Sequence, residues 1–189
     1  MDQVTWPILN FRSTTPEEFV SFWERLYSGY DEVYYAQNIG QPLTDERIEK
    51  WFQWKNGRRL SAKKSKSIQR YRNPEEQFEP DADPSTLRAF LSRPGGAIWR
   101  IFWLHLRHPK IFPIYDQHVH RAMAFLLKWP NREIPNRDPS KVKTYIEVYR
   151  PFTERFKGCD QRKVDRALWT FGRFLSLDYE SAITATPTR

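Results

Sequence analysis

Residues 98–106 limit the fold of this chain more than any other segment, because they are apolar around nearly the whole circumference of a helix. They read Ile-Trp-Arg-Ile-Phe-Trp-Leu-His-Leu. A helix of this kind has no side that water favours, so other elements must cover it. We therefore predict a central helix enclosed by further helices. A chain of 189 residues is long enough to form one domain with such a core.

Apolar residues elsewhere in the chain also recur at helical spacing, which predicts an all-α fold: a compact multi-helix domain. Thr15 and Glu18 have the spacing of a capping box, and Ser85 is expected to cap a short helix. Pro151 should bend the helix that contains it. No strand longer than a few residues is expected. The expected helices cover residues 15–30, 44–57, 61–71, 85–93, 98–106, 116–126, 139–156 and 160–175.

The domain organisation follows from where the helical pattern stops and resumes. Residues 72–84 hold prolines and a cluster of acids, and apolar helical spacing begins again directly after them. We therefore expect an exposed acidic loop inside one domain that spans residues 1–189. The tail, residues 178–189, should be frayed.

The composition narrows the class of protein. Aromatic residues make up 16% of the chain, so large rings should fill the core. No apolar run approaches the roughly 20 residues that would cross a bilayer, and the N-terminus lacks the features of a signal peptide. A single cysteine excludes an internal disulfide and a cysteine-bound iron–sulfur cluster. We expect an intracellular, cytoplasmic protein, monomeric and without a cofactor or membrane partner.

The charge distribution favours a polyanionic partner. The net charge is +8 and the sequence pI is about 9.6. Residues 58–72 are basic and contain no acid, whereas residues 75–83 contain acids and no base. The basic run is either a solvated helix face or a surface for nucleic acid. Its candidate DNA-binding residues are Arg58, Arg59, Lys63, Lys64 and Lys66.

The segment from residue 91 to residue 121 carries the candidate chemistry. Gly95 and Gly96 form a tight turn directly before the central helix, and backbone N–H groups in such a turn can hold a phosphate. The alternative is an ordinary turn. Asp116 follows an apolar, proline-rich loop and begins the next helix. It is either a helix cap or a partly desolvated functional carboxylate.

The order of these features resembles the helix-hairpin-helix DNA glycosylase superfamily, in which an Asp-Thr-His-Val-x-Arg motif follows the hairpin. Asp116, His118, Val119 and Arg121 match that motif, while Gln117 stands in the place of threonine. The motif matches cover residues 91–121. The resemblance implies a helix-hairpin-helix-like element, DNA binding, and a hydrolase of base excision and DNA repair.

The resemblance also implies roles for individual residues. Asp116 would be catalytic, because it would stabilise the positive charge that develops on deoxyribose as the base leaves. The DNA contacts would include Arg93, Gly95, Gly96, His118 and Arg121. A flipped-out base needs aromatic faces around it, unless these rings belong to the core. The candidate rings are Trp51, Trp54 and Tyr115, with Tyr34 and Tyr35.

Two departures from the family pattern change what is expected. Bifunctional members place a lysine nucleophile at the start of the helix after the hairpin, where this chain has Ala97. We therefore expect monofunctional hydrolysis of the N-glycosidic bond, without lyase chemistry. The hairpin reads Arg93-Pro94-Gly95-Gly96 instead of Gly-hydrophobic-Gly, so Arg93 is expected to contact a phosphate itself.

No metal site is expected, although all four histidines lie within residues 105–120. His118 and His120 are two positions apart and would point in different directions on a helix. His105 and His108 could share one helix face, but no cysteine is near them.

Two other functions stay open at this point. The same fold could bind DNA without cutting it, with Asp116 acting only as a cap. A protein-interaction domain with its partner on residues 75–83 would bind DNA weakly and lose it at moderate salt. Within the glycosylase reading, the base could be damaged, mismatched or a modified base of foreign DNA, in a single or a double strand.

Overall fold

The computed structural model describes residues 14–73 and 78–176, and this part of the chain is all-helical. It contains no strand within those residues. The first four helices are α1 (Pro16–Arg25), α2 (Glu32–Asn38), α3 (Asp45–Asn56) and α4 (Ala62–Ile68), the last continued by a 3₁₀ turn (Gln69–Arg72). The next three are α5 (Pro84–Leu91), α6 (Ala97–Arg107) and α7 (Gln117–Leu126). Helices α8 (Asp138–Thr144) and α9 (Arg150–Thr153), a 3₁₀ turn (Glu154–Phe156) and α10 (Gln161–Leu175) complete the order.

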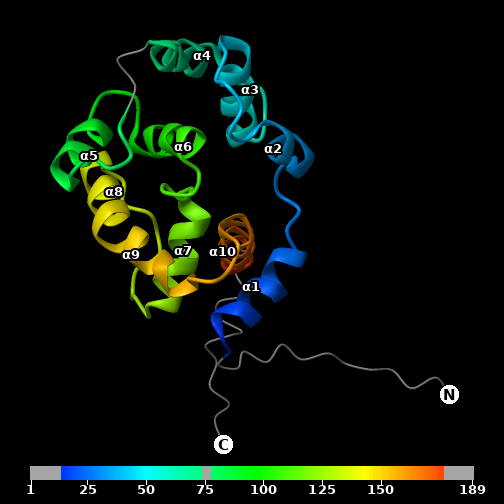
Figure 1. Ribbon diagram of the computed structural model, residues 1–189. Helices are drawn as coiled ribbons and strands as arrows, with labels where there is room; N and C mark the ends of the chain where they lie inside the picture. The colour runs from blue at the N-terminus through cyan, green and yellow to red at the C-terminus, as the bar shows by residue number, and fades with distance from the viewer. Residues whose placement is uncertain (1–13, 74–77, 177–189) are drawn as a thin grey trace, which may run out of the picture.

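Helix α6 lies in the middle of the molecule, as its apolar sequence predicts. Figure 1 shows α6 and α7 between the group α5, α8 and α9 on one side and α2, α3 and α4 on the other. Every residue of α6 from Arg100 to Leu106 is buried. On the α3 side, the Phe102 ring contacts Phe52 edge-to-face and lies parallel to Trp54. The central helix is therefore covered mainly by rings, which bury a large apolar area per residue.

The sequence expectation for the helix ends is corrected at two places. The predicted single helix over residues 15–30 ends at Arg25, and a separate helix, α2, follows with Asp31 as its cap. In this connection Gly29 lies against Trp169, and an added Cβ would lie 2.6 Å from that ring. The cap of α5 is Asp83, whose carboxylate accepts hydrogen bonds from Ser85 and Thr86, and Ser85 is already inside the helix. Pro84 occupies the first position of the helix, so the capping residue is the one before it, Asp83.

Other expected boundaries are confirmed. Thr15 and Glu18 form the capping box of α1, and Gly57 ends α3 in the left-handed conformation. Around Pro151 the chain stays helical, but residues Tyr145–Tyr149 directly before it form a π-helical segment. Proline has no backbone N–H to donate to the preceding turn of a helix. A π-helical segment shifts the pattern of backbone hydrogen bonds, so the missing donor can be accommodated.

Helix α10 packs on α7 and on α1, and this packing places the C-terminal helix beside the loop that ends at Asp116. The helices α10 and α7 approach closely at Gly172, where an added Cβ would lie 1.8 Å from the backbone oxygen of His118. The two helices touch through backbone here, which only glycine allows.

Gly172→Ala is expected to destabilise the protein by about 3 kcal/mol, the upper end of the usual cost of overpacking. Alanine would favour the helix by roughly 1 kcal/mol, but a backbone atom cannot move aside as a flexible side chain can. Urea unfolding measures the difference. Arg173→Ala, on the exposed side of the same helix, is the control, and equal stability of both variants would contradict the close contact.

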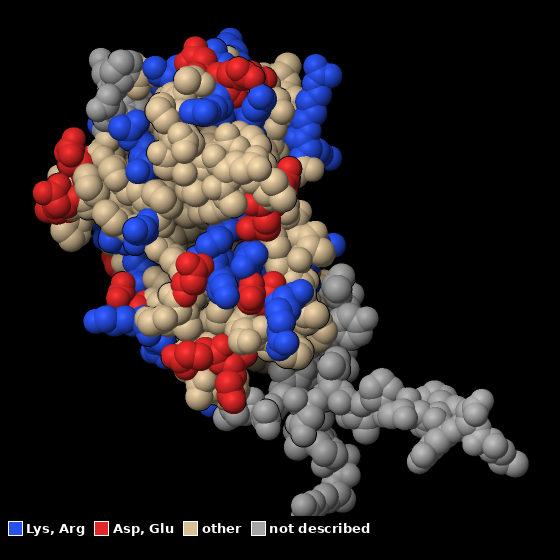
Figure 2. Space-filling model, turned by 45° about the vertical axis from the view of Figure 1, so that its right-hand side comes forward, with Lys and Arg blue, Asp and Glu red and all other residues tan. Residues whose placement is uncertain are grey.

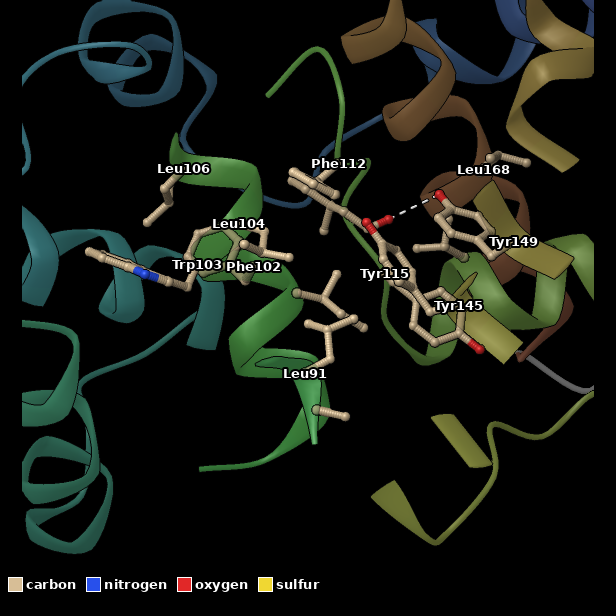
Figure 3. Packing of buried hydrophobic residues seen from close by; sticks show 14 of the residues in the cluster. Leu91, Phe102, Trp103, Leu104, Leu106, Phe112, Tyr115, Tyr145, Tyr149 and Leu168 are labelled. Atoms are coloured by element: carbon tan, nitrogen blue, oxygen red, sulfur yellow. Dashed lines mark hydrogen bonds between the residues drawn. The ribbon is translucent and has the colours of Figure 1, made fainter. Parts of the chain in front are cut away.

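Three tyrosines hold the loop that leads to Asp116. Figure 3 shows the rings of Tyr115, Tyr145 and Tyr149 together in the core, and their centroids are 5.0–6.0 Å apart. The Tyr145 hydroxyl donates to the Pro113 oxygen at 3.2 Å, and the Tyr149 hydroxyl donates to the Ile114 oxygen at 2.9 Å. These bonds satisfy buried carbonyls of a non-helical segment. The loop is thus fixed by the π-helical segment.

Two of the predicted features fall partly or wholly outside the described residues. Residues 74–77 of the predicted acidic loop and the tail from residue 177 lie outside them. In the described part of the loop, Phe78 is buried against Phe90 and Phe112 rather than exposed. Among the described residues, no helix is long and apolar enough to cross a membrane.

Candidate active site

Asp116 is the N-cap of α7, and its side chain is buried. Its Oδ1 accepts hydrogen bonds from the backbone N–H of His118 at 2.9 Å and of Val119 at 3.1 Å. Oδ1 therefore caps the helix, whereas Oδ2 is directed toward the protein interior. A carboxylate at a helix N-terminus is also favoured by the helix dipole.

The second oxygen of Asp116 accepts a hydrogen bond from the ammonium group of Lys55, with Nζ and Oδ2 2.7 Å apart. Lys55 lies on the last turn of α3 and is buried as well. Burial alone would raise the pKa of Asp116, but the Lys55 ammonium and the backbone N–H groups bring the pKa below its ordinary value. For Lys55, the Asp116 carboxylate more than offsets burial and raises the pKa. The two groups form a charged pair inside the protein at neutral pH.

The charged pair borders a small cavity with aromatic walls. Its volume is about 10 Å³, which is room for one water molecule rather than a base. Helices α3 and α10, the α1–α2 connection and the loop before α7 supply its lining. The lining residues are Tyr27, Tyr30, Trp54, Lys55, Ile114, Asp116, Arg162, Asp165 and Trp169.

A second buried carboxylate, Asp165 of α10, shares this cavity with Asp116. Arg162 donates a hydrogen bond to Asp165 and also pairs with Glu32 of α2. Burial raises the pKa of Asp165 to about 6, although Arg162 and Lys55 both act to lower it. The cavity therefore holds two carboxylates with different proton affinities, an arrangement typical of sites that perform acid–base chemistry.

The structure brings only part of the predicted base pocket to the cavity. Trp54 lines it, and its indole N–H donates to the Asp31 oxygen at 2.8 Å. Trp51 and Tyr115 are fully buried core residues and do not line it. Tyr34 and Tyr35 pack edge-to-face on Trp51 and do not line it either. Their large rings fill the space around α6 instead.

Sequence reasoning missed most of the lining. Tyr27, Tyr30, Lys55, Asp165 and Trp169 were not singled out, because their segments are far apart in the chain. A signal existed for Lys55. It lies three positions after Phe52 and four after Trp51, so it is on the buried face of α3, where a lysine needs an anionic partner.

The Gly95–Gly96 turn has the backbone shape of a tight turn, with φ of 129° and 89°. The carbonyl oxygen of Pro94, directly before the glycines, accepts hydrogen bonds from the buried Arg100 and the half-buried Arg70. Gly96 begins α6 without any side-chain cap, so the first turn of the helix has no side-chain acceptor for its N–H groups. Arg93 is exposed and lies over the Phe90 ring. This arrangement is compatible with an anion at the turn.

Two of the predicted DNA contacts serve the packing of α7. Arg121 donates to Glu133 at 2.9 Å and to the Gly172 oxygen at 3.3 Å. The His118 ring is half-buried edge-to-face on Trp169, with its centroid 5.2 Å from that ring. Both side chains connect α7 to neighbouring elements and so fix the position of Asp116.

The predicted basic residues lie on the α3–α4 connection and on α4. Arg58, Arg59, Lys63 and Lys66 are exposed and form no ion pair with any described residue. Lys64 is half-buried, donates to Asn56 and lies over the Trp99 ring. Figure 2 shows that basic and acidic side chains are mixed over the face in view. The positive charge of the chain is therefore not gathered over that face.

Two of the histidines, His105 and His120, are buried in the core. The ring of His105 is hydrogen-bonded to the Tyr35 hydroxyl and the Phe112 oxygen, both at 2.8 Å, and burial lowers its pKa to about 3. His120 is hydrogen-bonded to the Tyr115 hydroxyl at 2.7 Å. Among residues 14–73 and 78–176, no group of three or more His, Cys, Asp or Glu side chains could hold a metal ion.

Comparison with known proteins gives no relative for this chain. No protein-family model, no curated protein and no solved structure matches it.

Proposed function

We propose that this protein is a DNA glycosylase that hydrolyses the N-glycosidic bond of a damaged or modified base, with Asp116 as the catalytic carboxylate. The observation that carries the proposal is the buried Asp116–Lys55 pair beside an aromatic cavity, at the helix start that follows the helix–Gly turn–helix element. An isolated helix cap needs neither burial nor a lysine partner.

The chemistry fits a carboxylate that stays ionised. Bond cleavage at C1′ passes through an oxocarbenium-like state, which a nearby anion stabilises most in a site that excludes water. Lys55 and the N–H groups of α7 keep Asp116 ionised despite its burial. The same carboxylate can orient the water molecule that attacks C1′, and the cavity has room for one water.

A non-catalytic DNA-binding module is the second candidate, and the size of the cavity favours it. A base does not fit into about 10 Å³, so the lining must open to admit one. The Tyr30 ring packs against both Trp54 and Trp169 in this lining, with centroid distances of 4.7 Å and 5.6 Å. If the protein is an enzyme, these side chains must move when the substrate binds, whereas a binding module does not require this movement.

Base release from duplex oligonucleotides tests the proposal. Each duplex carries one base from a panel of deaminated, alkylated, oxidised and mismatched bases, and hot alkali converts every abasic site into a strand break. The glycosylase is supported if at least one base is released in a molar amount greater than that of the protein, because this shows turnover. Binding to all duplexes without any release supports the binding module.

Lys55 is not expected to act as an amine nucleophile. An amine attacks C1′ only in its neutral form, and the pairing with Asp116 raises the pKa of Lys55. Borohydride present during turnover should therefore trap no covalent protein–DNA adduct, and strand breaks should need added alkali. A borohydride-dependent adduct that Lys55→Arg removes would contradict this and would make the enzyme bifunctional.

A further inference from the structure

A second, larger cavity lies on the other side of Asp165. Its volume is about 490 Å³. It is lined by the loop before Asp116, the π-helical segment, α9 and the start of α10. Lys110, Glu154 and Lys157 are lining residues and are exposed, so the cavity opens to solvent. Tyr149, whose hydroxyl holds the Ile114 oxygen, forms part of the wall.

Asp165 is the residue that lines both cavities. On α10, Arg162 and Trp169 line the Asp116 cavity, whereas Gln161 and Val164 line the larger one. Asp165 lies where the two faces of the helix meet. The residue therefore lies between the candidate active site and a space that opens to solvent.

The surroundings of Asp165 raise its pKa toward neutral pH, so that a fraction of the carboxyl groups carries a proton there. The charged groups that act on it are Arg162 on its own helix, Lys55 of α3, Asp116 of α7 and Glu32 of α2. The hydroxyl groups of four tyrosines are also within electrostatic range: Tyr27, Tyr30, Tyr35 and Tyr149. Burial is the largest of all these effects and raises the pKa to about 6. The proposed hydrolysis assigns no task to this carboxyl group.

We propose that Asp165 is a second catalytic residue, which donates a proton to the base that leaves from the Asp116 cavity and regains a proton through the larger cavity. The inference rests on the proposed glycosylase function. In the step, the C1′–N bond breaks and its electron pair stays on the base. The Asp165 proton then moves to a ring nitrogen or exocyclic oxygen of that base. Water forms the new C1′–O bond, and the proton that it releases passes to solvent.

The chemistry of the leaving base provides the test. A neutral base such as hypoxanthine leaves as an anion unless it is protonated, whereas 7-methylguanine carries a positive charge and leaves as a neutral molecule. Asp165→Asn keeps the shape of the side chain but cannot donate an acidic proton. It should slow the release of hypoxanthine, or of the neutral base that the enzyme releases fastest, by about 10²-fold, a typical effect of general acid catalysis. Release of 7-methylguanine should change little.

The pH dependence gives a second, independent readout. Wild-type release of the neutral base should fall as the pH rises through about 6, because the proton on Asp165 is lost. Asp165→Asn should remove this decline, and Asp165→Glu, which keeps an acid, should restore it in part. Asp160→Asn, at the exposed cap of the same helix, is the matched control and should leave both the rate and the profile unchanged.

Each outcome decides between the hypotheses. Wild-type protein that releases neither kind of base from the panel overturns the glycosylase and this inference together. Wild-type release of cationic bases alone, or an Asp165→Asn effect of equal size on both kinds of base, overturns the role of Asp165 and leaves Asp116 in place. A variant that slows both bases because it unfolds is recognised by circular dichroism, and the Asp165→Glu profile then decides.

Discussion

Asp116→Asn is expected to reduce base release by about 10³-fold or more, because it removes the carboxylate that is proposed to stabilise the positive charge on the reacting sugar. Asparagine keeps an oxygen that can accept the two backbone hydrogen bonds of the α7 cap. The start of the helix should therefore persist in the variant. The measurement is the single-turnover rate on the fastest duplex of the panel, together with the Kd for the same duplex.

Asp83→Asn is the matched control for this substitution. Asp83 caps α5 and, like Asp116, accepts two backbone N–H bonds, but it is exposed and has no lysine partner. It should lose no activity. If both variants lose activity equally, or if Asp116→Asn keeps the wild-type rate, Asp116 is only a cap and the DNA-binding module becomes the better explanation.

Lys55→Met is expected to destabilise the protein by about 3–5 kcal/mol, the usual cost of removing one partner of a buried ion pair. The methionine side chain fills similar space, so the loss comes from the Asp116 carboxylate, which stays buried without its cation. Asp116 retains two N–H donors, but these neutralise only part of its charge. Chemical denaturation at pH 7 measures the free energy of unfolding.

The double variant Lys55→Met/Asp116→Asn distinguishes charge from packing. It removes both charges, so it should recover most of the stability that Lys55→Met loses. It also gives an inactive protein without an unpaired buried ion, which separates loss of catalysis from loss of folding. If the double variant is as unstable as the sum of the two single variants, the pair contributes through packing and not through charge.

The pH dependence of Lys55→Met follows from the same pair. In the wild type, the folded protein lowers the pKa of Asp116, so its stabilising effect is present above the unfolded pKa and is lost as the pH falls. Without Lys55, burial dominates and the pKa should rise. The destabilisation relative to wild type should therefore be larger at pH 7 than at pH 4, and a pH-independent difference would contradict the charge argument.

The amino-acid sequence by itself determined the helical class and most helix ends of this protein. The apolar circumference of residues 98–106 requires a buried central helix, and Thr15, Asp116 and Asp160 cap helices because their side chains accept backbone N–H bonds a few residues later. Caps and periodicity are local, so pattern reading finds them. The same local signals singled out Asp116 as the start of α7 after a buried loop.

Only the tertiary structure decided what surrounds Asp116. Lys55 is 61 positions away in sequence and Asp165 is 49 positions away, and each reaches the cavity because α3 and α10 pack against the elements on either side of the Asp116 loop. Likewise, Trp51 is in the core and Trp54 at the cavity, although both are buried rings on one helix. Sequence spacing says that such side chains are buried, but the packing of distant helices determines which of them meet. The charge pairing, the pKa values and the two cavities therefore arise from long-range contacts that no local pattern encodes.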